Sequence, residues 1–197
     1  MKNYSLFIIL TASLLISPTA QATSLLPINL QQLSTRATTV FHGVVTANEV
    51  RKDERTGHIA TFTSFEIIEP IKGEITANHT IKQIGGYDKE SNIRHHVHGV
   101  PRFKNGMEYI VFLPEASSLG FCSPLGLQQG SFMVRSDNGE KIVSNGHRLS
   151  NDHTSMLKLQ RTENYNSVQL PLAVRDDKPT QSRLEDFINT VRAYNTP

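Results

Sequence analysis

The spacing of apolar residues has a helical period near each end of the chain and a strand-like pattern between them. Leu30, Leu33 and Ala37 recur at steps of three and four residues with polar residues in between, which predicts a short amphipathic helix. From Val40 onward, β-branched and aromatic residues form short runs that turn-forming residues separate, as is typical of strands. The predicted strands cover residues 40–45, 59–68, 79–84, 107–113, 132–135 and 141–143.

Three of these runs predict more than a strand. Tyr109–Leu113 is apolar at every position, which indicates a central strand buried on both faces. Asp137–Gly139 separates the last two runs and contains Asn-Gly, the strongest short-range signal of a β-hairpin. In residues 59–68, strand alternation would place Phe62 on one side of the strand and Phe65 and Ile67 on the other. Either both faces are buried or a bulge shifts the phase, and both are common where a small sheet curls into a barrel.

The C-terminal pattern predicts an edge segment and a second helix. Val168–Val174 alternates, but Pro171 confines this run to a sheet edge or an extended crossing. Ser182 and Glu185 have the spacing of a capping box, in which each side chain satisfies the other's free backbone donor. The apolar stripe after them predicts a helix that docks on the body of the protein. Its residues are Leu184, Phe187, Ile188 and Val191.

Together these elements predict a mainly β protein. Turn residues recur about every ten positions, which favours an antiparallel barrel or sandwich over alternating β/α units. The 197 residues suit one domain of ordinary size, and 38% hydrophobic with 19% charged residues lies in the globular range.

The first 22 residues have the three parts of a secretory signal peptide. Lys2 precedes an apolar stretch, Leu6–Ile16, and Pro18 is followed by the small-residue triplet Ala20–Ala22. This order predicts export by the Sec-type route with cleavage after Ala22. After removal of the leader, no stretch approaches the roughly 20 apolar residues that a membrane span needs. We therefore expect a periplasmic or extracellular protein without a membrane span.

Charge and composition argue against several partners. The formal net charge is +2, so there is no strong basic field to hold phosphates. Aromatic residues make up 7% of the chain and Trp is absent, which gives little support to base stacking, so we expect no nucleic-acid partner. The single cysteine excludes an internal disulfide and a thiolate zinc cluster.

The densest group of metal-ligating residues is His95, His96 and His98, in a polar segment, Tyr87–Val100, that we interpret as a loop. Neutral imidazoles bind zinc or copper, and in an extended segment His96 and His98 point one way while His95 points the other. A catalytic zinc site takes three protein ligands and a closed one takes four, so further ligands would have to come from elsewhere, for example from His79 or His42. The alternative is a solvated loop without metal.

No complete catalytic constellation is present in the sequence, and we expect no enzyme. Cys122 could be a nucleophile activated by a histidine, or could form an intermolecular disulfide, but a lone thiol between Phe121 and a turn is more often a small buried apolar side chain. The nucleophile elbow, the phosphate-binding loop, the dinucleotide fingerprint and the zinc-protease helix are all absent.

The order of motifs resembles a family of uncharacterised bacterial exported proteins over most of the chain after the leader. The motifs are VFHGVV, TFTSFEIIEPIKG, IGG, GVPRFKNGMEYIVFL, GLQQGSFMV and LEDFINTVR. The resemblance implies an OB-like barrel related in shape to netrin and metalloprotease-inhibitor (TIMP-like) modules. Metalloprotease inhibitors act through a cysteine at the mature N-terminus, whereas this chain would begin at Thr23, so inhibition does not carry over.

These interpretations combine into one expectation. Residues 1–22 form a signal peptide, residues 23–146 a small antiparallel OB-like β-barrel with a short N-terminal helix, and residues 147–197 a polar connection, an edge segment and a C-terminal amphipathic helix on the barrel. The expected function is that of an exported, non-catalytic binding or accessory module without a cofactor, whose partner is another exported or envelope protein. The alternative function is metal binding through His95, His96 and His98, with zinc or copper.

Overall fold

The computed structural model describes residues 28–145 and 181–196. The leader at residues 1–22 and the alternating run at residues 168–174 lie outside the described residues, as does the polar stretch between residue 146 and that run. The expectations for these segments stay predictions.

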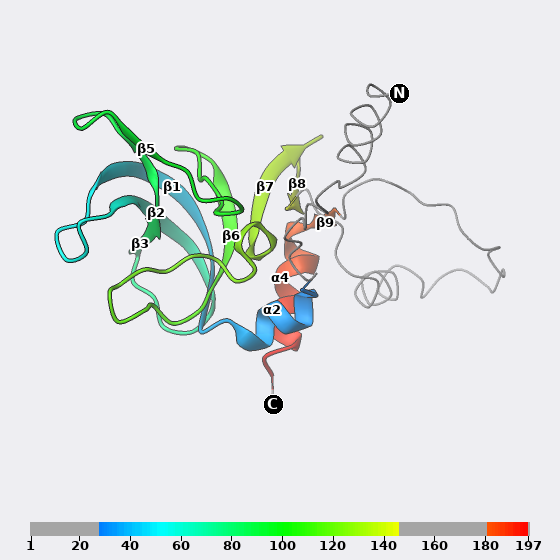
Figure 1. Cartoon of the computed structure of the whole chain (residues 1–197). Helices are drawn as coiled ribbons and strands as arrows, with labels where there is room; N and C mark the ends of the chain where they lie inside the picture. Colours follow the sequence, from blue (N-terminus) through cyan, green and yellow to red (C-terminus); the bar gives the residue numbers. More distant parts are fainter. Residues whose placement is uncertain (1–27, 146–180, 197) are drawn as a thin grey trace, which may run out of the picture.

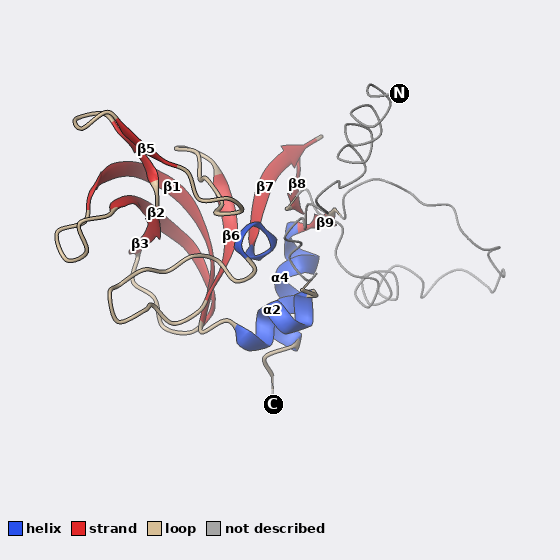
Figure 2. Cartoon of the chain, viewed as in Figure 1, coloured by secondary structure: helices blue, strands red, loops and turns tan. Residues whose placement is uncertain are grey.

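Seven strands form one antiparallel sheet, which is strongly curved (Figures 1 and 2). The strands are β1 (Thr39–Lys52), β2 (Ile59–Lys72), β3 (Asn78–Ile84), β6 (Glu108–Leu113), β7 (Ser131–Asp137), β8 (Glu140–Ser144) and β9 (Ser182–Arg183). Their order in the sheet is β3-β2-β1-β6-β7-β8-β9. The mainly β, antiparallel prediction is confirmed. Within the described ranges no ladder joins β3 to β9, so a closed barrel is not shown.

The central strand and the late hairpin are where the pattern placed them. β6 is the fourth of the seven strands, and Tyr109–Leu113 is buried throughout. β7 and β8 form a hairpin whose turn residues, Asn138 and Gly139, have φ of 50° and 85°. These left-handed angles are those that favour Asn-Gly in a two-residue turn.

Two predictions for the strands are wrong. Residues 87–100 are not wholly a loop, because β4 (Gly86–Asp88) and β5 (Ile93–His95) pair there as a second, two-stranded sheet. The strand predicted at residues 59–68 is also longer, because β2 passes through Pro70 and continues to Lys72. Pro70 is tolerated because it lies next to a register shift between β1 and β2, where the ladder is already interrupted.

Phe62 is out of phase with Phe65 and Ile67 because it faces the other side of the sheet, where the guanidinium of Arg51 lies 3.9 Å from its ring centroid. The bulge beside these residues lies in β1 and not in residues 59–68. Val45 pairs with Phe65, but Ala47 pairs with Ser64, so Thr46 is an extra residue in β1. A single extra residue reverses which side chains face inward. A further shift lies between His42 and Gly43.

The N-terminal helix α2 (Leu30–Arg36) and the C-terminal helix α4 (Leu184–Ala193) are both present and pack on one face of the sheet (Figure 2). α2 begins with a capping box between Asn29 and Gln32. Among the described residues no helix is long and apolar enough to cross a membrane.

The predicted capping box of α4 is wrong. Ser182 belongs to β9, where it pairs with Val143, and its hydroxyl donates to the carbonyl oxygen of Arg183. Arg183 is the N-cap residue and makes no side-chain capping bond. Because the ladder with β8 holds Ser182 in an extended strand, its side chain is not at the helix start.

The sheet carries a hydrophobic cluster on each face. The helix-side cluster joins α2 and α4 to the sheet, and its aromatic centre is Phe112, Phe132 and Phe187, with neighbouring ring centroids 4.8–6.3 Å apart. The opposite cluster contains Phe41, Phe65 and Phe103. β6 and the first half of β1 contribute residues to both clusters, which is why Tyr109–Leu113 has no polar face.

Candidate functional site

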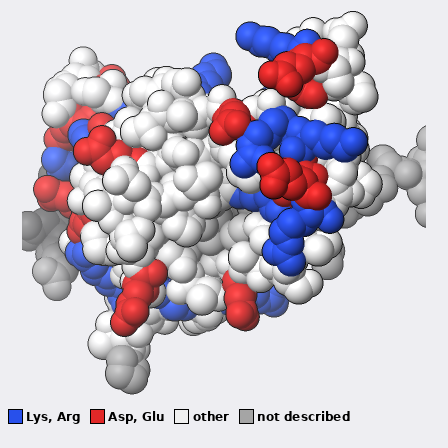
Figure 3. All heavy atoms as spheres, turned by 90° about the vertical axis from the view of Figure 1, so that its left-hand side faces the viewer, with Lys and Arg blue, Asp and Glu red and all other residues white. Residues whose placement is uncertain are grey.

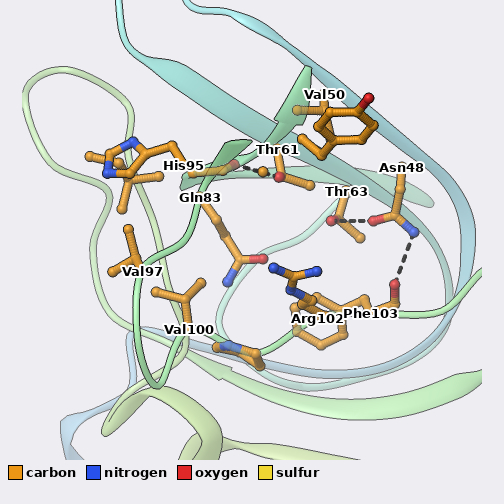
Figure 4. A pocket seen from close by; sticks show the side chains of 15 residues that line it. Asn48, Val50, Thr61, Thr63, Gln83, His95, Val97, Val100, Arg102 and Phe103 are labelled. Atoms are coloured by element: carbon orange, nitrogen blue, oxygen red, sulfur yellow. Dashed lines mark hydrogen bonds between the residues drawn. The ribbon is translucent and has the colours of Figure 1, made fainter. Parts of the chain in front are cut away.

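A pocket of about 260 Å³ lies beside the opposite cluster, on the same face of strands β1–β3 (Figure 4). One wall is the sheet. The other is the chain from Gly85 through the β4–β5 hairpin to Phe103. The pocket is open to solvent between these walls.

Cross-strand rows of side chains build the sheet wall. The row nearest the core consists of Val45, Phe65 and His79, and the next of Asn48, Thr63 and Ile81. The outermost row consists of Val50, Thr61 and Gln83. The two rows farther from the core therefore each carry two polar side chains where the row nearest the core carries one. The extra residue Thr46 brings Asn48 and Val50 onto this face, since without it Ala47 and Glu49 would take their positions.

Glycines allow the second wall to approach the sheet. Gly85 and Gly86 have φ of 89° and 139°. A Cβ atom on Gly86 would lie 2.6 Å from Cγ1 of Val50 and 2.7 Å from Oγ1 of Thr61. The β4–β5 hairpin can therefore lie against the outermost row only if residue 86 has no side chain.

Hydrogen bonds fix the polar groups of the sheet wall (Figure 4). The Thr63 hydroxyl donates to Oδ1 of Asn48 at 2.7 Å, and Nδ2 of Asn48 donates to the carbonyl oxygen of Phe103 at 3.1 Å. The Thr61 hydroxyl donates to the carbonyl oxygen of Gly85 at 2.7 Å. The bonds to Phe103 and Gly85 tie the two walls together, and the three bonds occupy donors of three pocket side chains.

Gln83 has no such partner. It is 2% exposed, and its Nε2 atom forms no hydrogen bond with any described residue. Leaving a buried amide donor unpaired costs about 1–3 kcal/mol, and buried polar groups in folded proteins are nearly always paired. Figure 4 shows its amide extending into the space between the walls. An unpaired donor at this place is a local conflict with the fold, and such conflicts are typical of functional sites.

Gln83 was not among the predicted site residues. It lies two residues after Ile81, so both side chains face the same side of β3. An amide at an inward-facing position of an alternating strand was the available signal.

Arg102 supplies the positive charge of the pocket. It extends into the same space as Gln83 and is largely exposed (Figure 4). Its guanidinium makes no hydrogen bond or ion pair with residues 28–145 or 181–196. None of the fifteen residues that line the pocket is Asp or Glu.

The outer edge of β3 is held by Lys82, the neighbour of Gln83. Its Nζ atom lies 2.9 Å from Oδ1 of Asp53 and 2.6 Å from the carbonyl oxygen of Leu119, and it stacks over the ring of Phe121 at 4.3 Å. The hydrogen bonds that Lys82 and Thr56 donate hold the pKa of Asp53 below its ordinary value. One side chain therefore fixes two loops against the strand that carries Gln83.

The structure separates the histidines that were proposed as metal ligands. His95 lines the pocket, while the rings of His96 and His98 lie together with centroids 6.4 Å apart. His79 packs in the opposite cluster at 5.8 Å from the ring of Phe41, and burial lowers its pKa. In the part of the chain that the structure describes, no three His, Cys, Asp or Glu residues gather as a metal site would require. Metal binding by His95, His96 and His98 stays a prediction.

His42, the other proposed ligand, lies on the helix side of the sheet. It is 2% exposed, and its Nε2 atom lies 2.9 Å from Oε2 of Glu108, which also accepts two hydrogen bonds from Lys141. Burial lowers the pKa of His42, although Glu108 opposes this shift. Burial tends to raise the pKa of Glu108, but hydrogen bonds from Lys141 and His42 bring it below its ordinary value.

Cys122 is a half-buried free thiol that packs against the opposite cluster. Its Sγ atom donates to the carbonyl oxygen of Pro114 at 3.5 Å, and burial raises its pKa. A raised pKa keeps the thiol protonated at neutral pH, which is the opposite of what a cysteine nucleophile needs.

Comparison with known proteins gives no family for the chain. No family model matches the sequence, and no curated protein matches it.

Proposed function

We propose that this protein is an exported, non-catalytic binding module that holds a segment of another exported or envelope protein in the pocket beside Gln83. One observation carries the proposal: a buried amide donor that has no partner among the described residues, in an open pocket where the neighbouring amide and hydroxyl donors are already used. A ligand that pairs with Nε2 of Gln83 removes the cost of leaving it unpaired.

The rim of the pocket favours a protein partner. Tyr87 is 38% exposed and lines the pocket, and Ile93, on the next strand of the same hairpin, is 52% exposed. The guanidinium of Arg94 stacks over the Tyr87 ring at 4.8 Å. Tyr and Arg are enriched among residues that dominate protein interfaces. A partner that places one group in the pocket can cover this hairpin with its neighbouring residues.

The face of the molecule shown in Figure 3 gives no support to a nucleic-acid ligand. On the face shown in Figure 3, acidic and basic side chains are interspersed around a broad area that has neither. Proteins that bind nucleic acids through phosphates present a continuous basic surface instead.

We also propose that the sheet belongs to an OB-like barrel and that the protein is exported. Support for the barrel comes from the curled antiparallel sheet and the bulges in its longest strands. OB-type barrels bind ligands on one sheet face and its loops, which matches the place of the pocket. Support for export comes from the leader pattern that ends at Ala22.

Site-specific photo-crosslinking in producing cells tests the binding proposal. A photoreactive residue in place of Tyr87 should give one defined adduct, whereas the same residue in place of Arg36, exposed on α2, should not. Equal adducts from both positions, no adduct from either, or catalytic turnover by the pure protein would contradict the proposal. Mass spectrometry of the purified protein should show Thr23 as the first residue, and an uncleaved leader would contradict export.

A further inference from the structure

We infer that the group received by the pocket is a carboxylate, bound between Nε2 of Gln83 and the guanidinium of Arg102. The inference rests on the proposed binding function and names the chemistry of the ligand.

The balance of donors and acceptors indicates an acceptor ligand. The hydroxyl hydrogens of Thr61 and Thr63 and the amide nitrogen of Asn48 are engaged in bonds within the protein. Gln83 offers an amide hydrogen and Arg102 offers several guanidinium hydrogens, none of them bonded to a described residue. A ligand group with two acceptor oxygens can pair with both residues at once.

Charge distinguishes a carboxylate from other acceptors. Arg102 is the one permanently charged side chain among those that line the pocket, and no carboxylate of the lining compensates it. A neutral carbonyl would leave this charge unpaired. A phosphate monoester carries about −1.5 to −2 charges at neutral pH and would exceed it. A carboxylate carries one charge and suits the planar guanidinium in a bidentate arrangement.

Volume limits the ligand to a small group. Drug-sized ligands occupy pockets of about 300–1,000 Å³, and a water molecule occupies about 30 Å³. The pocket volume of about 260 Å³ therefore accepts one or two amino-acid residues. The carboxylate can belong to the C-terminus of a polypeptide or to a free small acid, and the experiment below distinguishes these sources.

The side-chain amide of Gln83 is itself the probe. In ¹⁵N NMR spectra of the purified protein, its NH₂ resonances should shift in a saturable manner when short peptides with a free C-terminal carboxylate are added at up to tens of millimolar. The same peptides with a C-terminal amide should leave these resonances unchanged. Acetate and glutamate form the second arm, and inorganic phosphate the third.

Variants separate a carboxylate site from an unspecific one. Arg102→Gln should weaken binding at least about tenfold, because it removes the charge-assisted bond. Arg36→Gln, on α2, removes the same charge elsewhere and should leave binding unchanged. Gln83→Leu should abolish binding of the free-acid peptides. Because this variant lacks the amide probe, binding is followed at the resonances of Val97, which also lines the pocket. The variant should unfold at the same temperature as the wild type or at a higher one. Higher stability with lost binding assigns Gln83 to the ligand and not to the fold.

Every outcome of these measurements either supports or contradicts a bound carboxylate. Shifts by the free-acid peptides alone identify a polypeptide C-terminus, and equal shifts by acetate or glutamate identify a small acid. Equal shifts by acid and amide peptides, shifts by phosphate alone, or no shift with any carboxylate would overturn the inference. If the Tyr87 crosslink still forms in any of these cases, the binding function stands and only the carboxylate assignment fails.

Discussion

Asn48 on β1 lies opposite Thr63 on β2, and its amide oxygen accepts the hydrogen bond of the fully buried Thr63 hydroxyl. Asn48→Ala leaves this hydroxyl and the carbonyl group of Phe103 without their partner. We expect the free energy of unfolding to fall by about 1–3 kcal/mol in urea denaturation. In a Thr63→Val background the same substitution should cost less, because the hydroxyl is already gone. Equal costs in both backgrounds would show that the bond does not stabilise the fold.

Gly86 is expected to be intolerant of any side chain. Gly86→Ala places a methyl group against Val50 and Thr61 in a left-handed backbone conformation. Strain alone costs about 1–3 kcal/mol, and the clash adds to it. Gly106→Ala is the matched control, since φ there is 76° but no atom lies within 4 Å of the added carbon. Thermal unfolding should show the larger loss at Gly86, and an equal loss would mean that the hairpin does not lie against the sheet.

Buried histidines should make the protein less stable in weak acid. Burial lowers the pKa values of His42 and His79 below the ordinary value of 6.5, so the native state binds fewer protons than the unfolded state near that pH. Stability is therefore fully present above about pH 7 and declines as the pH falls through about 6.5, by at most about 1.4 kcal/mol per pH unit for each histidine.

A matched variant isolates the contribution of His42. Urea denaturation of His42→Gln between about pH 5 and 7.5 should give a smaller slope than the wild type. The lowered pKa of Glu108 contributes differently, because its stabilisation is lost only at more acidic pH. An unchanged slope in the variant would contradict a neutral, buried His42.

His96 and His98 are expected to bind metal no better than two exposed histidines do. Their rings lie 6.4 Å apart, and the described residues supply no group of three ligands. Titration of the metal-free protein with Zn²⁺ or Cu²⁺ should therefore show no stoichiometric site in either the wild type or the His96→Ala/His98→Ala variant. A stoichiometric site that disappears in the variant would instead establish the metal-binding alternative.

The residues that could be predicted from the sequence are those whose environment is set by local pattern. The buried strand Tyr109–Leu113 and the Asn138-Gly139 turn follow from alternation and backbone preference alone. The β4–β5 hairpin was missed because it has only three residues on each side and a polar composition. The capping box at Ser182 was wrong because pairing with Val143 overrides a local preference.

The candidate pocket could not be predicted in the same way. Its sheet wall depends on the extra residue Thr46, which decides whether Asn48 or Ala47 faces Thr63. The run around Phe65 indicated that a bulge was one of two explanations, but nothing in it located the inserted residue on β1. Its second wall depends on how the chain after β3 folds back so that His95 and Arg102 line the same pocket as Gln83. The spacing of these residues in the sequence does not show this fold-back.

The two helices that share one hydrophobic cluster have a consequence for the order in which the chain can mature. Leu30 and Leu33 are among the first described residues, whereas Phe187 and Val191 are among the last, and all four are packed together on Phe112 and its neighbours. Under the export that we propose, a polypeptide that emerges from its N-terminus cannot complete this cluster until α4 has emerged. The helix-side cluster therefore closes only when residues from both ends of the described chain have met.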